Sequence, residues 1–135
     1  MASNKKLRVL IVDDSPFIRE RLPGMLSELS EVEVVGYAED GDEAIDFARS
    51  LNPDVAILDI RMPGKSGIEV LQELKKDKPG PILIIFTNYP ITQYRNKCLD
   101  LGADFFFDKS ADFNKLFALL RQLSREKSQR RKSQK

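Results

Sequence analysis

Five polar residues stand where short apolar runs of the sequence end. Two adjacent carboxylates, Asp13 and Asp14, follow the first of these runs, and Asp59 follows the third. Thr87 and Lys109 follow the fourth and the fifth. If the runs are parallel strands of an open α/β sheet, their carboxyl ends share one edge, which is where such sheets bind ligands. We therefore expect these five side chains to converge on one crevice.

The chemistry available to this group is that of carboxylates, a hydroxyl and an ammonium. Three carboxylates in one crevice repel each other and raise one another's pKa, and a divalent cation relieves that repulsion. Oxygen ligands alone favour Mg²⁺ and also suit Mn²⁺. A metal ion, a hydroxyl and a lysine suit the oxygens of a phosphoryl group, and a carboxylate can attack phosphorus to give an acyl phosphate. The residues therefore suggest Asp59 as the phosphoryl acceptor.

Each of these residues taken singly also has a simpler interpretation. The two adjacent aspartates could form only a turn and a helix cap before Ser15-Pro16. Asp59 could be a loop residue, the threonine the end of a strand, and the lysine a solvated charge. The complete set, with suitable chemistry at four strand ends, is what favours a phosphoryl site.

The composition excludes several other chemistries. The 135 residues include no histidine and one cysteine, with 22 basic residues against 21 acidic ones. Without histidine this chain has no Ser-His-Asp triad, no histidine-ligated metal and no phosphohistidine. Cys98 cannot form an internal disulfide, which suggests the reducing cytoplasm, and we expect it to be a partly buried small hydrophobic residue. The length suits one domain.

The elements that must position the polar residues alternate along the chain. The apolar runs predict five strands, at residues 7–12, 32–38, 54–58, 82–86 and 105–107. Apolar residues at helical spacing predict five helices, beginning near residues 15, 40, 68, 92 and 112. This alternation predicts an α/β fold, a doubly wound five-stranded parallel sheet covered on both faces. Within the first helix, Pro23-Gly24 predicts a kink or a break.

The two ends of the chain differ from its body. Residues 1–6 are polar and expected to be disordered, and they are too few for a signal peptide or a membrane span. Residues 7–124 form the predicted domain. Residues 125–135 carry six basic residues and one acidic residue, and we expect a fraying helix end that becomes disordered. This basic tail could be a solubilising end, or it could contact nucleic acid or another acidic partner.

Four motifs follow one another in a specific order: Leu10 to Asp14, Asp54 to Asp59 followed by Met62-Pro63-Gly64, Phe86-Thr87, and Gly102 to Lys109. In this combination they resemble the response-regulator receiver domains of two-component signalling, and are similar to the stand-alone chemotaxis response regulators. The resemblance covers roughly residues 7–124. It implies a flavodoxin-like fold of five βα units with strand order 2-1-3-4-5.

The resemblance also implies a function for the carboxylates. Asp59 would accept phosphate from a histidine of a partner histidine kinase or histidine phosphotransfer protein. Asp14, Asp59 and the backbone carbonyl of Arg61 would bind Mg²⁺, and Asp13 would reach the ion through water. The chain would then be a signalling switch rather than an enzyme that acts on a separate substrate.

Three further residues would respond to the phosphoryl group. By resemblance, Thr87 would hydrogen-bond it and Lys109 would form an ion pair with it. Phe106 occupies the switch-aromatic position of the family and would turn inward as the threonine moves. The surface of the fourth helix, fifth strand and fifth helix would then change its affinity for an output protein.

The sequence departs from the family pattern at several positions. Phe106 lacks the tyrosine hydroxyl, so it could report the switch only through packing. Ser110 stands where the family usually has proline after a cis bond, which leaves open whether the bond before Ser110 is cis or trans. Arg61 and Tyr89 are bulky residues that flank the site, and we expect them to hinder attacking water and slow self-dephosphorylation.

Two other functions stay open at this point. A receiver domain truncated from a DNA-binding transcriptional regulator would also have a last helix followed by a basic tail. A metal-dependent aspartyl phosphatase of the haloacid dehalogenase type needs a second carboxylate two positions after its nucleophile. If Asp13 were that nucleophile, the position would hold Ser15, which disfavours this function. We expect Phe105 and Phe107 to be ordinary core and strand-edge residues, and we expect neither a membrane nor nucleic acid as the partner of this chain alone.

Overall fold

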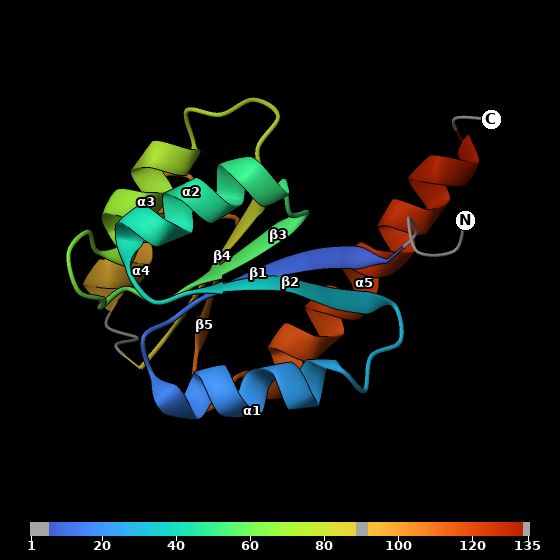
Figure 1. The fold of residues 1–135 in the computed structure, drawn as a ribbon, viewed down its shortest axis with the longest axis horizontal. Helices are drawn as coiled ribbons and strands as arrows, with labels where there is room; N and C mark the ends of the chain where they lie inside the picture. The colour runs from blue at the N-terminus through green and yellow to red at the C-terminus, as the bar shows by residue number, and fades with distance from the viewer. Residues whose placement is uncertain (1–5, 89–91, 134–135) are drawn as a thin grey trace.

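A computed structural model describes residues 6–88 and 92–133, in which five strands alternate with five helices as predicted (Figure 1). The strands are β1 (Leu7–Val12), β2 (Val32–Ala38), β3 (Val55–Leu58), β4 (Ile82–Thr87) and β5 (Phe105–Asp108). The helices are α1 (Pro16–Leu26), α2 (Gly41–Leu51), α3 (Gly67–Leu74), α4 (Thr92–Asp100) and α5 (Phe113–Ser133).

The five strands form one parallel sheet in the order β2-β1-β3-β4-β5. The predicted doubly wound sheet and its strand order are therefore confirmed. Helices α2, α3 and α4 lie on one face of the sheet, and α1 and α5 lie on the other (Figure 1). The order of the strands reverses at β1 and β3, so the loops after these two strands leave toward opposite faces. In open α/β sheets, ligands bind at the carboxyl edge where loops diverge in this way.

Two apolar clusters hold the helices to the sheet, one on each face. Successive side chains of a strand point to opposite faces. Leu10 and Val12 therefore join the cluster beneath α2, α3 and α4, while Val9 and Ile11 join the cluster beneath α1 and α5. Strand β3 is buried along its whole length. Because both faces of the central strands are covered, these strands are apolar throughout rather than alternating.

The sequence predicted a kink or a break at Pro23-Gly24, and helix α1 passes through Pro23 without a break. Leu22 and Leu26, on either side of this proline, are 0% and 1% exposed. Burying a leucine contributes about 1.5–3 kcal/mol, and two of them offset the ~3 kcal/mol cost of a proline inside a helix. The amide of Ser27 closes the helix by donating to the Pro23 carbonyl at 2.9 Å. Packing on the sheet therefore outweighs the local preference.

Helix α5 is longer than predicted and includes most of the basic tail. It continues to Ser133 (Figure 1), so the expectation of disorder is wrong for residues 125–133. Lys127 accounts for part of this extension, because its ammonium donates to Asp54 Oδ2 and to the Lys6 carbonyl, each at 2.7 Å. The Lys127 side chain is only 13% exposed. Of the amino-terminal segment that we expected to be disordered, residues 1–5 lie outside the described residues.

The other helices begin and end close to the predicted positions. Helix α2 begins after Asp40, whose side chain accepts a hydrogen bond from the Glu43 amide at 2.9 Å. Helix α3 begins with a capping box between Ser66 and Glu69. Gly102 follows α4 with a φ of 107°, a conformation that favours glycine. None of the helices in the described part of the chain is both long enough and apolar enough to cross a membrane.

Candidate functional site

The polar residues that follow the strands meet at the carboxyl edge of the sheet. Asp59 continues the pairing of β3 with β1, because its amide donates to the Val12 carbonyl at 3.0 Å. Lys109 continues the pairing of β5 with β4, because its amide donates to the Thr87 carbonyl at 2.9 Å. Thr87 itself is fully buried. The hydrogen bonds between neighbouring strands therefore continue at Asp59 and Lys109, just after the ends of β3 and β5.

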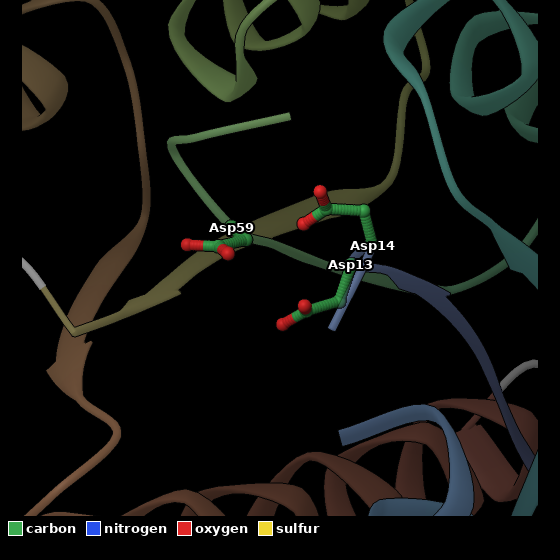
Figure 2. Close-up of side chains that lie close together, drawn as sticks. All are labelled: Asp13, Asp14 and Asp59. Carbon is green, nitrogen blue, oxygen red and sulfur yellow. The ribbon is translucent and has the colours of Figure 1, made fainter. Parts of the chain in front are cut away.

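Three carboxylates lie close together at this edge (Figure 2). Asp13, Asp14 and Asp59 each place an oxygen within 4.8 Å of the others. Asp13 and Asp59 are 4% and 7% exposed, whereas Asp14 is exposed to solvent. The structure thus brings together the three aspartates that the sequence placed after β1 and β3.

Lys109 supplies a positive charge to this group. Its ammonium lies 2.5 Å from Asp13 Oδ2 and 3.1 Å from Asp59 Oδ2, and its side chain is buried. A lysine is buried at low cost only where it has charged partners. The other oxygens are also held, because Asp13 Oδ1 accepts from the Ser15 amide and Asp59 Oδ1 from the Ile60 amide, each at 2.8 Å. Asp13, Asp59 and Lys109 therefore form one fixed cluster.

Burial raises the pKa of Asp13 above its ordinary value. The hydrogen bond and charge of Lys109 and the amide of Ser15 act in the opposite direction, and the charge of Asp59 raises the pKa further. Desolvation is the largest of these causes. A second cation next to Asp13 would therefore favour its ionised form.

The donor set of the cluster fits a divalent cation. When all groups are ionised, three carboxylates and one ammonium leave two negative charges in the crevice. Carboxylate oxygens are hard ligands of the kind that Mg²⁺ and Mn²⁺ prefer. Asp14 is exposed while Asp13 and Asp59 are buried, so the group is open to solvent on the side of Asp14.

Two glycines that the sequence analysis did not single out shape the loop after Asp59. A Cβ atom on Gly67 would lie 1.9 Å from the Asp59 carbonyl oxygen, and the Gly67 amide donates to the Ile60 carbonyl at 2.8 Å. A Cβ atom on Gly41 would lie 2.4 Å from Lys65 Cβ. Because no larger residue fits at either position without a shift of the main chain, the loop can fold back closely beneath the site. The sequence feature that could have pointed to these two residues is that each is a glycine at the first position of a helix, Gly41 in α2 and Gly67 in α3.

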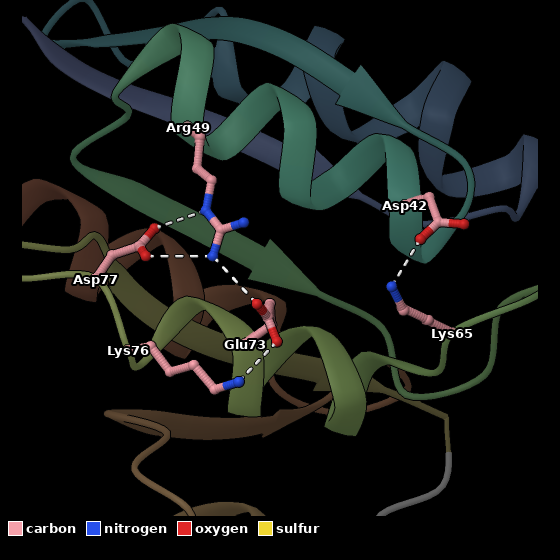
Figure 3. A network of polar contacts seen from close by, with 6 residues as sticks. All are labelled: Asp42, Arg49, Lys65, Glu73, Lys76 and Asp77. Carbon is pink, nitrogen blue, oxygen red and sulfur yellow. Dashed lines mark hydrogen bonds and ion pairs between the residues drawn. The ribbon is translucent and has the colours of Figure 1, made fainter.

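Polar contacts on the surface tie α2 to α3 next to this loop (Figure 3). Arg49 donates to Asp77 at 3.2 Å and to Glu73 at 3.3 Å, and Lys65 pairs with Asp42 at 2.9 Å. These contacts raise the pKa of Arg49 and of Lys65. Exposed ion pairs add little to stability, so the apolar residues that α2 and α3 share beneath them contribute most to their packing.

The remaining candidate residues of the site have different surroundings. Phe106 is 7% exposed and already points into the cluster beneath α2, α3 and α4. Arg61 is exposed. Tyr89 lies outside the described residues. The bond between Lys109 and Ser110 is trans, since the cis bond among the described residues is Lys78–Pro79.

The other residues singled out in the sequence pack as ordinary parts of the fold. Phe105 and Phe107 are partly buried against the cluster beneath α1 and α5, with their rings stacked at 6.3 Å. Cys98 is fully buried, and desolvation raises the pKa of its thiol, which keeps it protonated. The expectations for Phe105 and Phe107 are confirmed, and Cys98 is more deeply buried than the partly buried position that we expected.

The fold and the cluster at its carboxyl edge identify a class of protein. Residues 9–121 match the response regulator receiver domain. The chain belongs to this family, and it is a receiver domain of the two-component response regulators.

Known proteins of this family are similar to this chain over most of its length. A protein-glutamate methylesterase/protein-glutamine glutaminase of Alkalilimnicola ehrlichii is 40% identical over 105 residues, which cover 77% of this chain and 27% of that protein. The chain thus spans about a quarter of the length of such methylesterase relatives.

Two solved structures illustrate the similarity of the fold. The response regulator domain of Thermotoga maritima CheB is 34% identical, with a TM-score of 0.77 over 90% of this chain and 95% of that one. A chain of the CheX–CheY–BeF₃–Mg²⁺ complex from Borrelia burgdorferi is 28% identical, with a TM-score of 0.75 over 87% of this chain and 88% of that one.

Proposed function

We propose that this receiver domain accepts a phosphoryl group on Asp59 from a histidine of a partner kinase or phosphotransfer protein. The observation that carries the proposal is the buried Asp59 carboxylate, held by Lys109 within a cluster of three aspartates at the carboxyl edge of the sheet. Because the chain has no histidine, the donor belongs to another protein.

The transfer exchanges one bond to phosphorus for another. The Asp59 carboxylate supplies the electron pair of the new O–P bond, and the P–N bond of the donor phosphohistidine breaks. The imidazole keeps the electron pair of the broken bond and takes up a proton. Lys109, which already contacts the Asp59 oxygen at 3.1 Å, neutralises part of the negative charge on the transferred group.

We propose Mg²⁺ as the metal of the site, with Mn²⁺ as a possible substitute. Asp14, Asp59 and the backbone carbonyl of Arg61 would hold the ion, and Asp13 would contact it through water. When bound, it supplies positive charge to the phosphoryl oxygens. The carboxylate donor set supports this proposal, as does the Borrelia burgdorferi relative, whose complex contains BeF₃ and Mg²⁺.

The proposed output is a change of the surface formed by α4, β5 and α5. Thr87 would turn toward the phosphoryl group. The Phe106 ring, which is already buried beneath α2, α3 and α4, would stay in this inward position because the threonine leaves space for it. An output protein that recognises this arrangement would bind the phosphorylated form more tightly. The chain would thus act by changing its affinity for a protein rather than by turning over a substrate.

Labelling by a small phosphodonor tests the proposal directly. We expect acetyl phosphate to modify the native protein in the presence of Mg²⁺, with the modification detected by intact-protein mass spectrometry. EDTA should abolish the labelling, and so should Asp59→Asn, because the amide cannot form the acyl phosphate. Equal labelling of the native protein and Asp59→Asn would contradict the proposal. Continuous release of phosphate from a generic phosphate ester would instead favour an aspartyl phosphatase.

A further inference from the structure

A compact turn begins at Asp108, the last residue of β5, and contains Lys109. Asp108 Oδ1 accepts two hydrogen bonds from Ser110, one from its amide at 2.8 Å and one from its hydroxyl at 2.7 Å. The Asp108 amide donates to Asp112 Oδ2 at 2.9 Å, and the Asp112 amide donates back to the Asp108 carbonyl at 2.8 Å. Four hydrogen bonds among these three residues therefore enclose Lys109.

This turn fixes the main chain from which the Lys109 side chain extends. Before the turn, the Lys109 amide is held by the Thr87 carbonyl. After it, the Ser110 amide is held by Asp108, in a bond that proline could not donate because it has no N–H group. A lysine side chain has much conformational freedom to lose. A main chain fixed on both sides limits where its ammonium can lie.

We propose that Asp108 and Ser110 are positioning residues that direct the Lys109 ammonium between Asp13 and Asp59. Both act through Lys109 and touch neither the metal ligands nor the acceptor oxygen in the described contacts. The inference rests on the proposed function, because Lys109 is the residue that would contact the phosphoryl group. Ser110 stands where the family usually has proline, a residue that could not donate the amide hydrogen bond to Asp108.

Substitutions at Ser110 distinguish the effect of its hydroxyl hydrogen bond from the effect of its amide hydrogen bond. The probe is acetyl phosphate in saturating Mg²⁺, and the readout is the initial labelling rate of Asp59. Ser110→Ala should lower the rate about three- to tenfold, the factor expected for the net contribution of one hydrogen bond that is exposed to solvent. Asp108→Ala, which removes both acceptor bonds, should lower it further. Ser110→Thr keeps the hydroxyl and should stay within about twofold of native.

A matched control deletes a similar hydroxyl elsewhere. The hydroxyl of Ser27 donates to the Gly24 carbonyl at 2.6 Å, at the end of α1 and outside the cluster. Ser27→Ala should leave the labelling rate unchanged. Thermal unfolding of every variant shows whether it is folded under the conditions of the assay.

A double-mutant cycle with Lys109→Met tests whether Ser110 acts through the lysine. If it does, Ser110→Ala should have little further effect on the labelling rate once the ammonium is absent. An equal loss with and without the lysine would overturn the inference, because it would mean that Ser110 only folds the turn. A native rate in Ser110→Ala would overturn it as well. If native protein and Asp59→Asn were labelled equally, the proposed function would fail first, and this inference with it.

Discussion

At the scale of single residues, the site depends on an unusual balance of buried charges. Asp13 and Asp59 share one lysine, and Asp14 adds a third carboxylate from the exposed side. One ammonium cannot neutralise three carboxylates. Burial raises the pKa of Asp13, and the charge of Asp59 adds to this effect, which leads to a prediction about stability.

We predict that metal-free Asp13→Asn is more stable than the native protein at neutral pH. Because the folded pKa of Asp13 is raised above its unfolded value, the folded protein binds this proton more tightly. Stability therefore falls as the pH rises from the ordinary aspartate pKa, about 3.9, through the raised value. The difference between the two proteins in free energy of unfolding should narrow as the pH is lowered through this interval. Urea unfolding of both proteins in EDTA, at several pH values, measures this difference in the free energy of unfolding.

The comparison of variants isolates Asp13 from other acidic groups. The pKa of Glu73 is lowered, chiefly by its hydrogen bond to Lys76, so its contribution to stability changes with pH in the opposite direction. Glu73 is present in both proteins, and its contribution cancels in the difference. Asp46→Asn, at an exposed position on α2, serves as the control. A difference that stays constant with pH would contradict the prediction.

At the scale of secondary structure, α5 shows how one contact can extend an element. Residues 125–133 have no apolar side chain to bury and many like charges, which by themselves favour disorder. Lys127 favours helix in this segment, because Asp54 and the Lys6 carbonyl hold its ammonium at the amino ends of β1 and β3. Asp54 also accepts from the Arg8 amide at 2.8 Å. The anchor therefore joins α5 to two strands.

We predict that Lys127→Ala frays the last turns of α5. The variant loses two hydrogen bonds of a charged group, and overall stability should fall by about 1 kcal/mol. Amide hydrogen exchange should accelerate within residues 124–133 and stay unchanged in the central strands. Arg125→Ala, at an exposed position on the same helix, is the matched control. Unchanged protection of these amides in Lys127→Ala would show that the anchor does not hold the helix.

At the scale of the whole molecule, the sheet couples the site to the stability of the domain. Asp59 and Lys109 hydrogen-bond to Val12 and Thr87 at the ends of β1 and β4. These strands lie in the buried middle of the sheet. A ligand that requires the site to be formed therefore requires the folded domain.

We predict that Mg²⁺ stabilises the folded protein against thermal unfolding. A ligand that binds only the folded state adds about 2.7 kcal/mol when present at one hundred times its Kd. Asp14→Asn should weaken this effect, because it removes the exposed carboxylate of the cluster, while Asp46→Asn should retain it. Differential scanning calorimetry at increasing Mg²⁺ concentration measures the shift in Tm. A Tm that does not change with Mg²⁺ would contradict the proposed metal site.

Much of this architecture followed from local patterns in the sequence. Apolar runs without alternation predicted buried parallel strands, and polar residues at their ends predicted the cluster of Asp13, Asp14, Asp59 and Lys109. These predictions succeed because a strand buried on both faces must be apolar throughout. In addition, the carboxyl ends of parallel strands share one edge of the sheet.

Contacts between distant parts of the chain decided the rest. Pro23 stays inside α1 because the leucines beside it are buried against the sheet. The basic tail is helical through Ser133 while Lys127 meets an aspartate 73 residues away in the sequence. The Lys109 ammonium lies between Asp13 and Asp59, and Asp59 is 50 residues away in the sequence. Local sequence expresses the preferences of a segment, but only the folded chain shows which distant groups outweigh them.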